Sequence, residues 1–338
     1  MKVSTTLIRS LAVLVGLPVL IAGCGAASHG KVAVRPSPSS HPSSTVAASP
    51  TPTPQPALPA PAIVQVDNIE YARPQYGLNQ AQIVYEYDTE GGITRFSAIY
   101  FTPPQGQVGD IRSARMVSIA LVNEYHGLLI YSGASQYVTA HLRAGNVPRF
   151  NETSAGGLLY RTSTAYPPYN LFTDGANIAR LISQAALPHV GYQLWNRTSN
   201  PTGGVPATRF SAPLSPTVDP VYTWNPADHG YIRNDSLTGT FVIPGGTPLP
   251  MATVVVMQVQ VQTLNYIEDV NGIHGLAYTL TGSGPVQVFT DGQEFSGTWQ
   301  SAASGPPQFV GSNGKPLPVA PGTVWIDLVP QGASATSG

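Results

Sequence analysis

The stretch IVYEYDTEGGITRFSAIYF, residues 83–101, predicts a β-hairpin from which the rest of the chain can be interpreted. Polar and apolar side chains alternate on both sides of a Gly91-Gly92 pair. A glycine pair between two alternating runs is a strong signal for a two-residue hairpin turn. In that register Asp88 pairs with Arg95, and Glu86 pairs with Ser97.

This register predicts one apolar and one charged face. The apolar face carries Tyr85 and Tyr87, and the charged face carries Glu86, Asp88 and Glu90 together with Arg95. Three carboxylates on one strand face repel one another unless a cation, a second arginine, a polar ligand or water lies among them. The three acids could bind a hard cation through oxygen, or they could simply face water.

The residues after the hairpin predict helices and a short strand. Residues 112–126 show a helical apolar stripe, and Arg112 and Ser113 lie at its start. A helix N-terminus with arginine nearby suits an anion. A buried strand at 128–131, a small-residue loop and a helix to about residue 143 follow, and Asp174 is the expected N-cap of a third helix that ends before Pro188.

The second half of the chain has no helical periodicity. Short strands are expected, with dense turn signals between them, at 208–211, 221–224, 240–243, 253–262, 277–281, 286–290, 294–299 and 323–329. We therefore expect an α+β protein, with a mixed α/β domain at 63–200 and a β-rich domain at 201–331. Residues 332–338 are expected to be a disordered tail.

The N-terminal segment predicts a signal peptide followed by a disordered tether. Residues 1–23 combine a basic start with an apolar run too short to span a bilayer, and LIAGC at 20–24 resembles the lipobox of bacterial lipoproteins. That resemblance implies a lipid on Cys24 and cleavage before it. The alternative is an ordinary secretory signal in which Cys24 is incidental. Residues 24–62 contain nine prolines and no acid, which predicts a disordered tether.

Composition excludes several function classes. The net charge of −1 argues against a nucleic-acid partner. The single cysteine excludes a disulfide framework or a cysteine-rich zinc site. Metalloprotease, nucleophile-elbow, phosphate-loop and dinucleotide motifs are absent from the sequence, so no cofactor, metal or catalytic residue is assigned.

Several blocks resemble the YerB-like lipoproteins of the DUF3048 family, across nearly all of residues 63–330. The matching positions are 72–75, 77–78, Ala81, 83–86, 90–96, 112–115, 132–133, Ser135, Arg161, Pro168, Asn170, Trp224, Tyr231, Arg233, 291–292, Gly297, Trp299, 321–323 and 325–326. The resemblance implies a two-domain bacterial lipoprotein without an established enzymatic activity.

Polar residues of these blocks form the predicted ligand-binding cleft of the first domain. They are Glu86, Asp88, Glu90, Arg95, Arg112, Arg115, Ser132, Ser135, Arg161 and Asn170. Arginine favours bidentate contacts with phosphate and carboxylate, although structural arginine–carboxylate pairing is the simpler alternative. We therefore expect a lipid-anchored protein on the extracytoplasmic face of the cell membrane that binds an anionic cell-wall polymer, another envelope component or a protein partner. The alternative is a wall-acting hydrolase or transferase with a carboxylate acid or base beside arginines.

Overall fold

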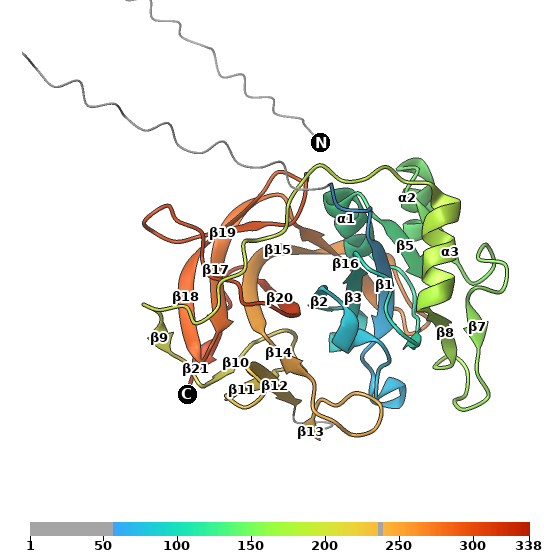
Figure 1. Cartoon of the computed structure of the whole chain (residues 1–338). Helices are drawn as coiled ribbons and strands as arrows, with labels where there is room; N and C mark the ends of the chain where they lie inside the picture. The colour runs from blue at the N-terminus through green and yellow to red at the C-terminus, as the bar shows by residue number, and fades with distance from the viewer. Residues whose placement is uncertain (1–56, 236–238) are drawn as a thin grey trace, which may run out of the picture. The chain divides into compact units, whose positions relative to one another are not determined.

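The computed structural model describes residues 57–235 and 239–338, which belong to one compact unit, Gln55–Gly338. The expected signal peptide, Cys24 and most of the tether lie outside the described residues. An isolated bridge joins Leu58 to Val190, so packed backbone begins inside the stretch expected to be tether. The described chain is mostly β, and its three α-helices lie between residues 116 and 185 (Figure 1).

A twelve-stranded sheet forms the centre of the compact unit (Figure 1). Its main path runs β19-β18-β17-β15-β20-β2-β3-β1-β5-β6, with β16 beside β15 and β9 beside β18. The strands are β1 (Ala62–Asp67), β2 (Ile83–Asp88), β3 (Thr94–Tyr100), β5 (Leu128–Tyr131), β6 (Arg149–Asn151), β9 (Val205–Pro206), β15 (Thr253–Ile267), β16 (His274–Thr279), β17 (Gly282–Thr290), β18 (Gln293–Ser301), β19 (Gln308–Val310) and β20 (Val324–Pro330).

Strands from the two halves of the sequence are direct neighbours in this sheet. The N-terminal strand β2 pairs in parallel with β20, which lies near the C-terminus. Strand β20 in turn pairs in parallel with β15. The backbone hydrogen bonds of the large sheet therefore run without interruption from one half of the chain to the other.

The β2–β3 hairpin forms, but its predicted register is wrong by one residue. Asp88 pairs with Thr94, Tyr87 with Arg95, and Glu86 with Phe96. The connection holds five residues, not two, because the Thr89 N–H donates to the Ile93 carbonyl across the 3₁₀ turn η3 (Glu90–Gly92). Gly91 and Gly92 both have positive φ, which glycine adopts at no steric cost.

Both faces of the hairpin are buried, so the expected division into an apolar and a charged face is also wrong. Tyr85 and Tyr87 pack in the core beneath α1 (Met116–Tyr125) and α2 (Gln136–Ala144). Val84 and Phe96 pack in the opposite core with α3 (Gly175–Ala185) and the smaller sheets. A central strand that is covered on both faces carries apolar residues at successive positions. The alternation of polar and apolar residues therefore does not indicate which face is exposed.

The helices begin and end near their predicted limits. Ser135 caps α2 by accepting a hydrogen bond from the Val138 N–H at 3.3 Å. Asp174, the expected N-cap, accepts one from the Asn177 N–H at 2.8 Å at the start of α3. The 3₁₀ turns η1 (Glu70–Ala72) and η2 (Leu78–Gln80) lie between β1 and β2.

Two smaller sheets complete the described fold. The six-stranded sheet contains β10 (Arg209–Ser211), β11 (Val221–Asn225), β12 (Gly230–Asp235), β13 (Gly239–Thr240), β14 (Pro250–Met251) and β21 (Thr336–Ser337). The three-stranded sheet contains β4 (Gln107–Gly109), β7 (Tyr160–Arg161) and β8 (Leu171–Asp174). Because β21 pairs with β10, the expectation of a disordered tail at 332–338 is wrong.

Candidate functional site

A polar cleft of about 550 Å³ lies where several parallel strands end. Strands β1 and β2 both pair antiparallel with β3, so they run in the same direction. Strand β5 is parallel to β1, and β15 is parallel to β2 through β20. The four strands β1, β2, β5 and β15 therefore end on the same side of the sheet. Carboxyl ends of parallel strands are the usual place for ligand sites in open sheets. The cleft is lined by Asp67, Ile69, Thr89, Glu90, Ile93, Arg95, Arg112, Ser113, Arg115, Ala134, Ser135, Tyr169, Glu268, Asp269, Val270 and Asn271.

Asp67, at the end of β1, holds two arginines of the cleft. The Arg112 Nε lies 2.6 Å from Asp67 Oδ2. The Arg95 Nη2 lies 3.9 Å from Asp67 Oδ1, and Arg95 Nη1 donates to the Ser113 carbonyl at 3.1 Å. Arg95 is buried, whereas 24% of the Arg112 side chain is exposed. Arg112 is thus the arginine of this pair that can meet a ligand.

The third arginine of the cleft is held by two carboxylates. Arg115 donates through Nε to Glu90 Oε2 at 2.7 Å and through Nη2 to the other oxygen of the same carboxylate. Its Nη1 lies 3.5 Å from Glu268 Oε1. This bidentate arrangement satisfies most of the guanidinium and makes Arg115 part of the wall of the cleft.

Two helices start at the cleft. Arg115 is the N-cap of α1, and Ser135 is the N-cap of α2. Free backbone N–H groups at a helix start carry partial positive charge and favour anions. Tyr169 also lines the cleft, and the Arg112 guanidinium carbon lies 5.5 Å from its ring centroid. Cationic and dipolar groups therefore meet at one wall.

A buried acid lies behind the arginines. Asp110 is only 2% exposed, and neither side-chain oxygen has a hydrogen-bond partner among the described residues. Burial, reinforced by the nearby Asp67 carboxylate and opposed by Arg112 and Arg161, raises the pKa of Asp110 to about 7. Asp110 can therefore change its charge near neutral pH, although it does not line the cleft itself.

The structure places five of the ten sequence-predicted site residues in this cleft: Glu90, Arg95, Arg112, Arg115 and Ser135. Ser132 lies beside it, with its N–H donating to the Arg112 carbonyl at 3.0 Å. Arg161 makes an exposed ion pair with Glu152 and donates to Asn170 Oδ1 at 2.7 Å. Arg161 and Asn170 do not line the cleft.

Glu86 and Asp88 are separated from the cleft. Glu86 is fully buried on the opposite face of the sheet and pairs with Arg233 at 2.8 Å. Asp88 is half-buried, and burial raises its pKa to about 7. The predicted cluster of three strand carboxylates facing Arg95 is therefore wrong, because the one-residue shift of register moves Arg95 to the face of Tyr87.

Sequence reasoning missed several cleft residues, chiefly Asp67, Tyr169 and Glu268. Asp67 ends the alternating segment AIVQVD, residues 62–67, which could have been interpreted as a strand with an acid at its carboxyl end. Glu268 carried no local signal. It reaches the cleft only because β15 continues to Ile267, beyond its expected end at residue 262.

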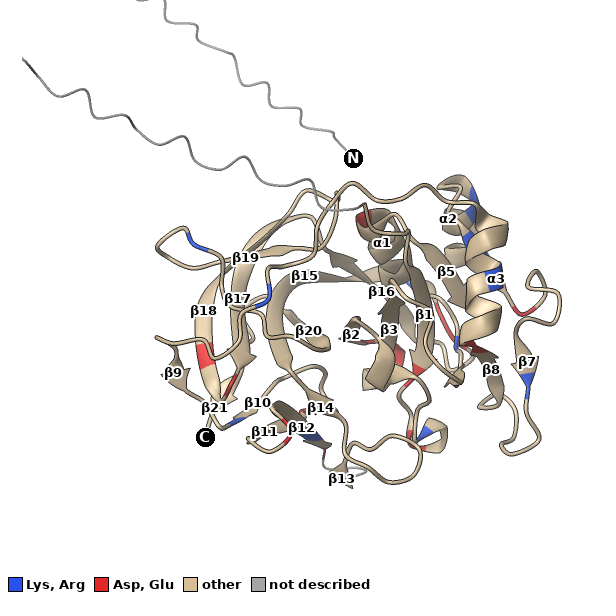
Figure 2. Ribbon diagram, in the orientation of Figure 1, with Lys and Arg blue, Asp and Glu red and all other residues tan. Residues whose placement is uncertain are grey.

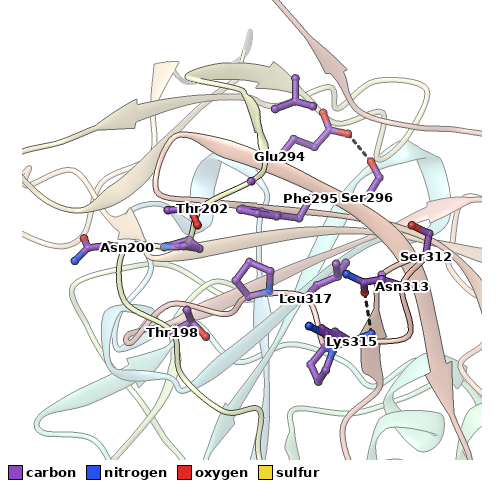
Figure 3. Close-up of a pocket in the computed structure, with 16 residues that line it drawn as sticks. Thr198, Asn200, Thr202, Glu294, Phe295, Ser296, Ser312, Asn313, Lys315 and Leu317 are labelled. Carbon is purple, nitrogen blue, oxygen red and sulfur yellow. Dashed lines mark hydrogen bonds between the residues drawn. The ribbon is translucent and has the colours of Figure 1, made fainter.

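A second groove, of about 720 Å³, lies in the C-terminal half and has a different character (Figure 3). Its charged lining residues are Glu294 and Lys315, and Figure 3 shows them at opposite ends. Glu294 accepts a hydrogen bond from Ser296 at 2.9 Å, and the Lys315 backbone N–H donates to Asn313 at 2.9 Å. Most of the ribbon carries no charged residue (Figure 2). The arginine cleft, in contrast, is lined by three arginines and four carboxylates, so it is the stronger candidate.

The described residues, 57–235 and 239–338, show neither a metal-ligand cluster nor a helix that could span a membrane. In that part of the chain, no group of three or more histidine, cysteine or acidic residues is arranged to hold a metal ion. Within the same ranges, no helix has the length and hydrophobicity needed to cross a membrane.

The comparisons with known proteins identify the family. The profile described as "Protein of unknown function (DUF3048) N-terminal domain" matches residues 48–190. The profile of the corresponding C-terminal domain matches residues 210–326. The chain belongs to the DUF3048 family.

A similar protein and a similar solved structure both come from Bacillus subtilis. The chain is 28% identical over 284 residues to "Putative lipoprotein YerB" of strain 168, covering 80% of this chain and 81% of the relative. The crystal structure of the YerB protein from Bacillus subtilis matches with a TM-score of 0.67 at 24% identity. That match covers 83% of this chain and 95% of the solved chain, and it supports the fold.

Proposed function

We propose that this protein is a lipid-anchored protein on the extracytoplasmic face of a bacterial membrane, and that its cleft binds an anionic component of the cell envelope. The name of the Bacillus subtilis relative and the lipobox-like segment at 20–24 support the anchor. Two or three acyl chains on Cys24 would hold the protein at the membrane, because each buried methylene contributes about 0.8 kcal/mol.

The proposed binding function depends above all on Arg112. Its Nε forms an ion pair with Asp67 Oδ2 at 2.6 Å, and no side-chain nitrogen of Arg112 donates a hydrogen bond to a residue in the described ranges. These donors lie beside the starts of α1 and α2, in an arrangement suited to a phosphate or carboxylate. The cleft lining carries three arginines and four carboxylates, so its formal net charge is −1. An anion would therefore be held by the local donors of Arg112 and the helix starts, and not by general attraction to polyanions.

Replacing Arg112 tests the binding site. The Arg112→Gln variant should bind polyphosphate, or the anionic polymer fraction of a bacterial cell wall, at least tenfold more weakly than the wild type. Arg180→Gln, on the exposed side of α3, is the matched control and should bind as the wild type does. Isothermal titration with the full chain in detergent measures both. Unchanged affinity of Arg112→Gln would contradict the proposal.

The anchor is tested separately. Cys24→Ala should move the protein from the membrane fraction to the medium, or leave it as an uncleaved precursor. Cell fractionation and mass spectrometry of the mature N-terminus distinguish these results. An unmodified Cys24 on the mature wild-type protein would show that the anchor assignment is wrong.

Asp110 favours hydrolysis as the second candidate function. A carboxyl group with a pKa of about 7 beside arginines has the properties of a general acid or base. Glu86 lacks them, because it is fully buried and ion-paired with Arg233. We rank binding first because Asp110 does not line the cleft. Turnover of purified wall fractions that is lost in Asp110→Asn, while binding is retained, would reverse this order.

A further inference from the structure

Three tyrosines beside the cleft form an exposed aromatic cluster. Tyr71 on η1 is 62% exposed, and Tyr166 is 58% exposed. The Tyr71 ring centroid lies 6.5 Å from that of Tyr166 and 5.8 Å from that of Tyr169. Tyr166 and Tyr169 are themselves 5.8 Å apart with perpendicular rings. Contiguous exposed apolar surface is one mark of a binding site.

The cluster is held in place locally. The Tyr169 N–H donates to the Tyr166 carbonyl at 2.9 Å, which closes a turn around Pro167 and Pro168. The two prolines restrict the backbone of that turn. The aromatic surface is therefore arranged before any ligand binds, which lowers the entropic cost of using it.

The cluster also joins two hollows of the surface. Tyr169 lines the arginine cleft, and Tyr71 lines an adjacent hollow of about 260 Å³. Ile69 and Ile93 belong to the walls of both. A chain-like ligand could therefore contact Arg112 in the cleft and continue across the tyrosines into the second hollow.

A glycan fits this combination of groups. One face of a sugar ring presents C–H groups that pack against an aromatic ring, while its hydroxyls hydrogen-bond at the ring edges and to tyrosine hydroxyls. Arg112, stacked at 5.5 Å from Tyr169, adds a cation at the margin of the cluster. A membrane surface fits less well, because Lys315 is the only lysine in the described ranges and the acidic Glu70 adjoins Tyr71.

We propose that Tyr71, Tyr166 and Tyr169 form the sugar-binding part of the site, and that the ligand is an anionic glycan whose phosphate or carboxylate meets Arg112. This inference rests on the proposed function of the arginine cleft. The sugar rings stack on Tyr71 and Tyr166, and the tyrosines supply selectivity for glycans over other polyanions.

Four probes separate sugar recognition from charge recognition: phosphorylated dextran, polygalacturonate, neutral dextran and polyphosphate. We expect the full chain to bind phosphorylated dextran or polygalacturonate at least tenfold more tightly than polyphosphate of equal charge. The preferred one of the two identifies the anionic group. Tyr71→Ala combined with Tyr166→Ala should weaken glycan binding about tenfold and leave polyphosphate binding unchanged.

Two further variants serve as controls for effects of the substitutions on the fold. Tyr160→Ala changes a partly exposed tyrosine of β7, the strand that precedes the turn of Tyr166 and Tyr169. Tyr160 lines a different hollow, so this variant should bind every probe as the wild type does. Replacing Tyr71 and Tyr166 by phenylalanine should retain most of the glycan affinity, because the ring faces remain. Equal losses for glycan and polyphosphate in the double alanine variant would overturn the inference.

The remaining outcomes separate this inference from the function on which it rests. Wild-type glycan affinity in the double alanine variant, together with loss in Arg112→Gln, would overturn the tyrosine site and leave the anion site intact. Failure of the wild type to bind either anionic glycan would also overturn the glycan inference. Binding that is unchanged in Arg112→Gln for every anionic probe would overturn the anion site itself.

Discussion

At the scale of single residues, the three arginines of the cleft differ in their ion-pair partners and in their exposure to solvent. Arg95 and Arg112 share Asp67, but Arg95 is buried while Arg112 reaches solvent. Arg115 is matched by Glu90 and Glu268. The structural pairing expected as the simpler alternative is thus present for all three arginines. Only Arg112 combines an ion pair with exposed donor groups.

Asp110 should make stability depend on pH. The unfolded side chain loses its proton near pH 3.8, whereas burial raises its pKa in the folded state to about 7. Between these pH values the native state binds one more proton, so the contribution of Asp110 to the free energy of unfolding falls as pH rises and levels off above pH 7. Asp110→Asn should therefore be more stable than the wild type at pH 8, by about 2–4 kcal/mol.

Denaturant melts of both proteins at pH 4 and pH 8 test this prediction. At pH 4 the neutral carboxyl resembles the amide, so the difference should nearly disappear. The exposed Asp228 provides the control, because Asp228→Asn should show little difference at either pH. A wild type that equals or exceeds the Asp110→Asn variant in stability at pH 8 would mean that Asp110 is ionised at low cost.

At the scale of elements, the turn of the β2–β3 hairpin decides which groups meet. Ser215 Oγ and Thr217 Oγ1 both donate to the Gly92 carbonyl, at 2.6 and 2.7 Å. These contacts come from residues more than 120 positions away, and they hold a five-residue connection in place of the expected two-residue turn. Arg95 consequently faces Asp67 of β1 across the strand pair and not Asp88 of β2.

Arg95→Ala should be destabilising because it removes one of the two arginines that face the buried Asp67 carboxylate. Removing the sole partner of a buried charge costs about 3–5 kcal/mol, and the loss here should be smaller, about 1–3 kcal/mol, because Arg112 still pairs with Asp67 at 2.6 Å. Arg161→Ala is the contrast, because the Arg161–Glu152 pair is more than one-third exposed on both sides and should contribute about 0–1 kcal/mol. Urea unfolding measures both, and a loss below 1 kcal/mol for Arg95→Ala would show that Asp67 does not depend on Arg95.

At the scale of the whole described unit, a network of buried charged residues links the six-stranded sheet to the twelve-stranded sheet. Arg233 of β12 pairs with Glu86 of β2 and with Asp235, each at 2.8 Å, and Arg73 also pairs with Asp235 at 2.7 Å. Asp327 lies beside Glu86 on the neighbouring strand β20. Burial, reinforced by Glu86, raises the pKa of Asp327 well above its ordinary value. Arg233 forms its ion pair with Glu86 and not with Asp327.

Arg233→Met should therefore destabilise the unit by about 3–5 kcal/mol, because it leaves the Glu86 carboxylate buried and unpaired. Adding Glu86→Gln should recover part of the loss, since the double variant has no orphaned charge. A thermodynamic cycle of the two single variants and the double variant measures this coupling. Strictly additive losses would contradict an energetic link between the two sheets.

The sequence by itself determined the local features of this protein: the apolar run followed by Cys24, the proline-rich segment, the hairpin and the approximate limits of three helices. It also singled out Arg112, Arg115 and Ser135 near helix starts. Such features depend on neighbouring residues, through capping, periodicity and the conformational freedom of glycine. These are the interactions that a sequence pattern records directly.

Only the tertiary structure decided the register of the hairpin, the partner of Arg95, the place of Glu268 in the cleft and the pairing of Glu86 with Arg233. Each depends on contacts between residues far apart in the chain. The Gly91-Gly92 turn takes its conformation from Ser215 and Thr217, and a shift of one residue moves every following side chain to the other face of the sheet. No local pattern contains that information.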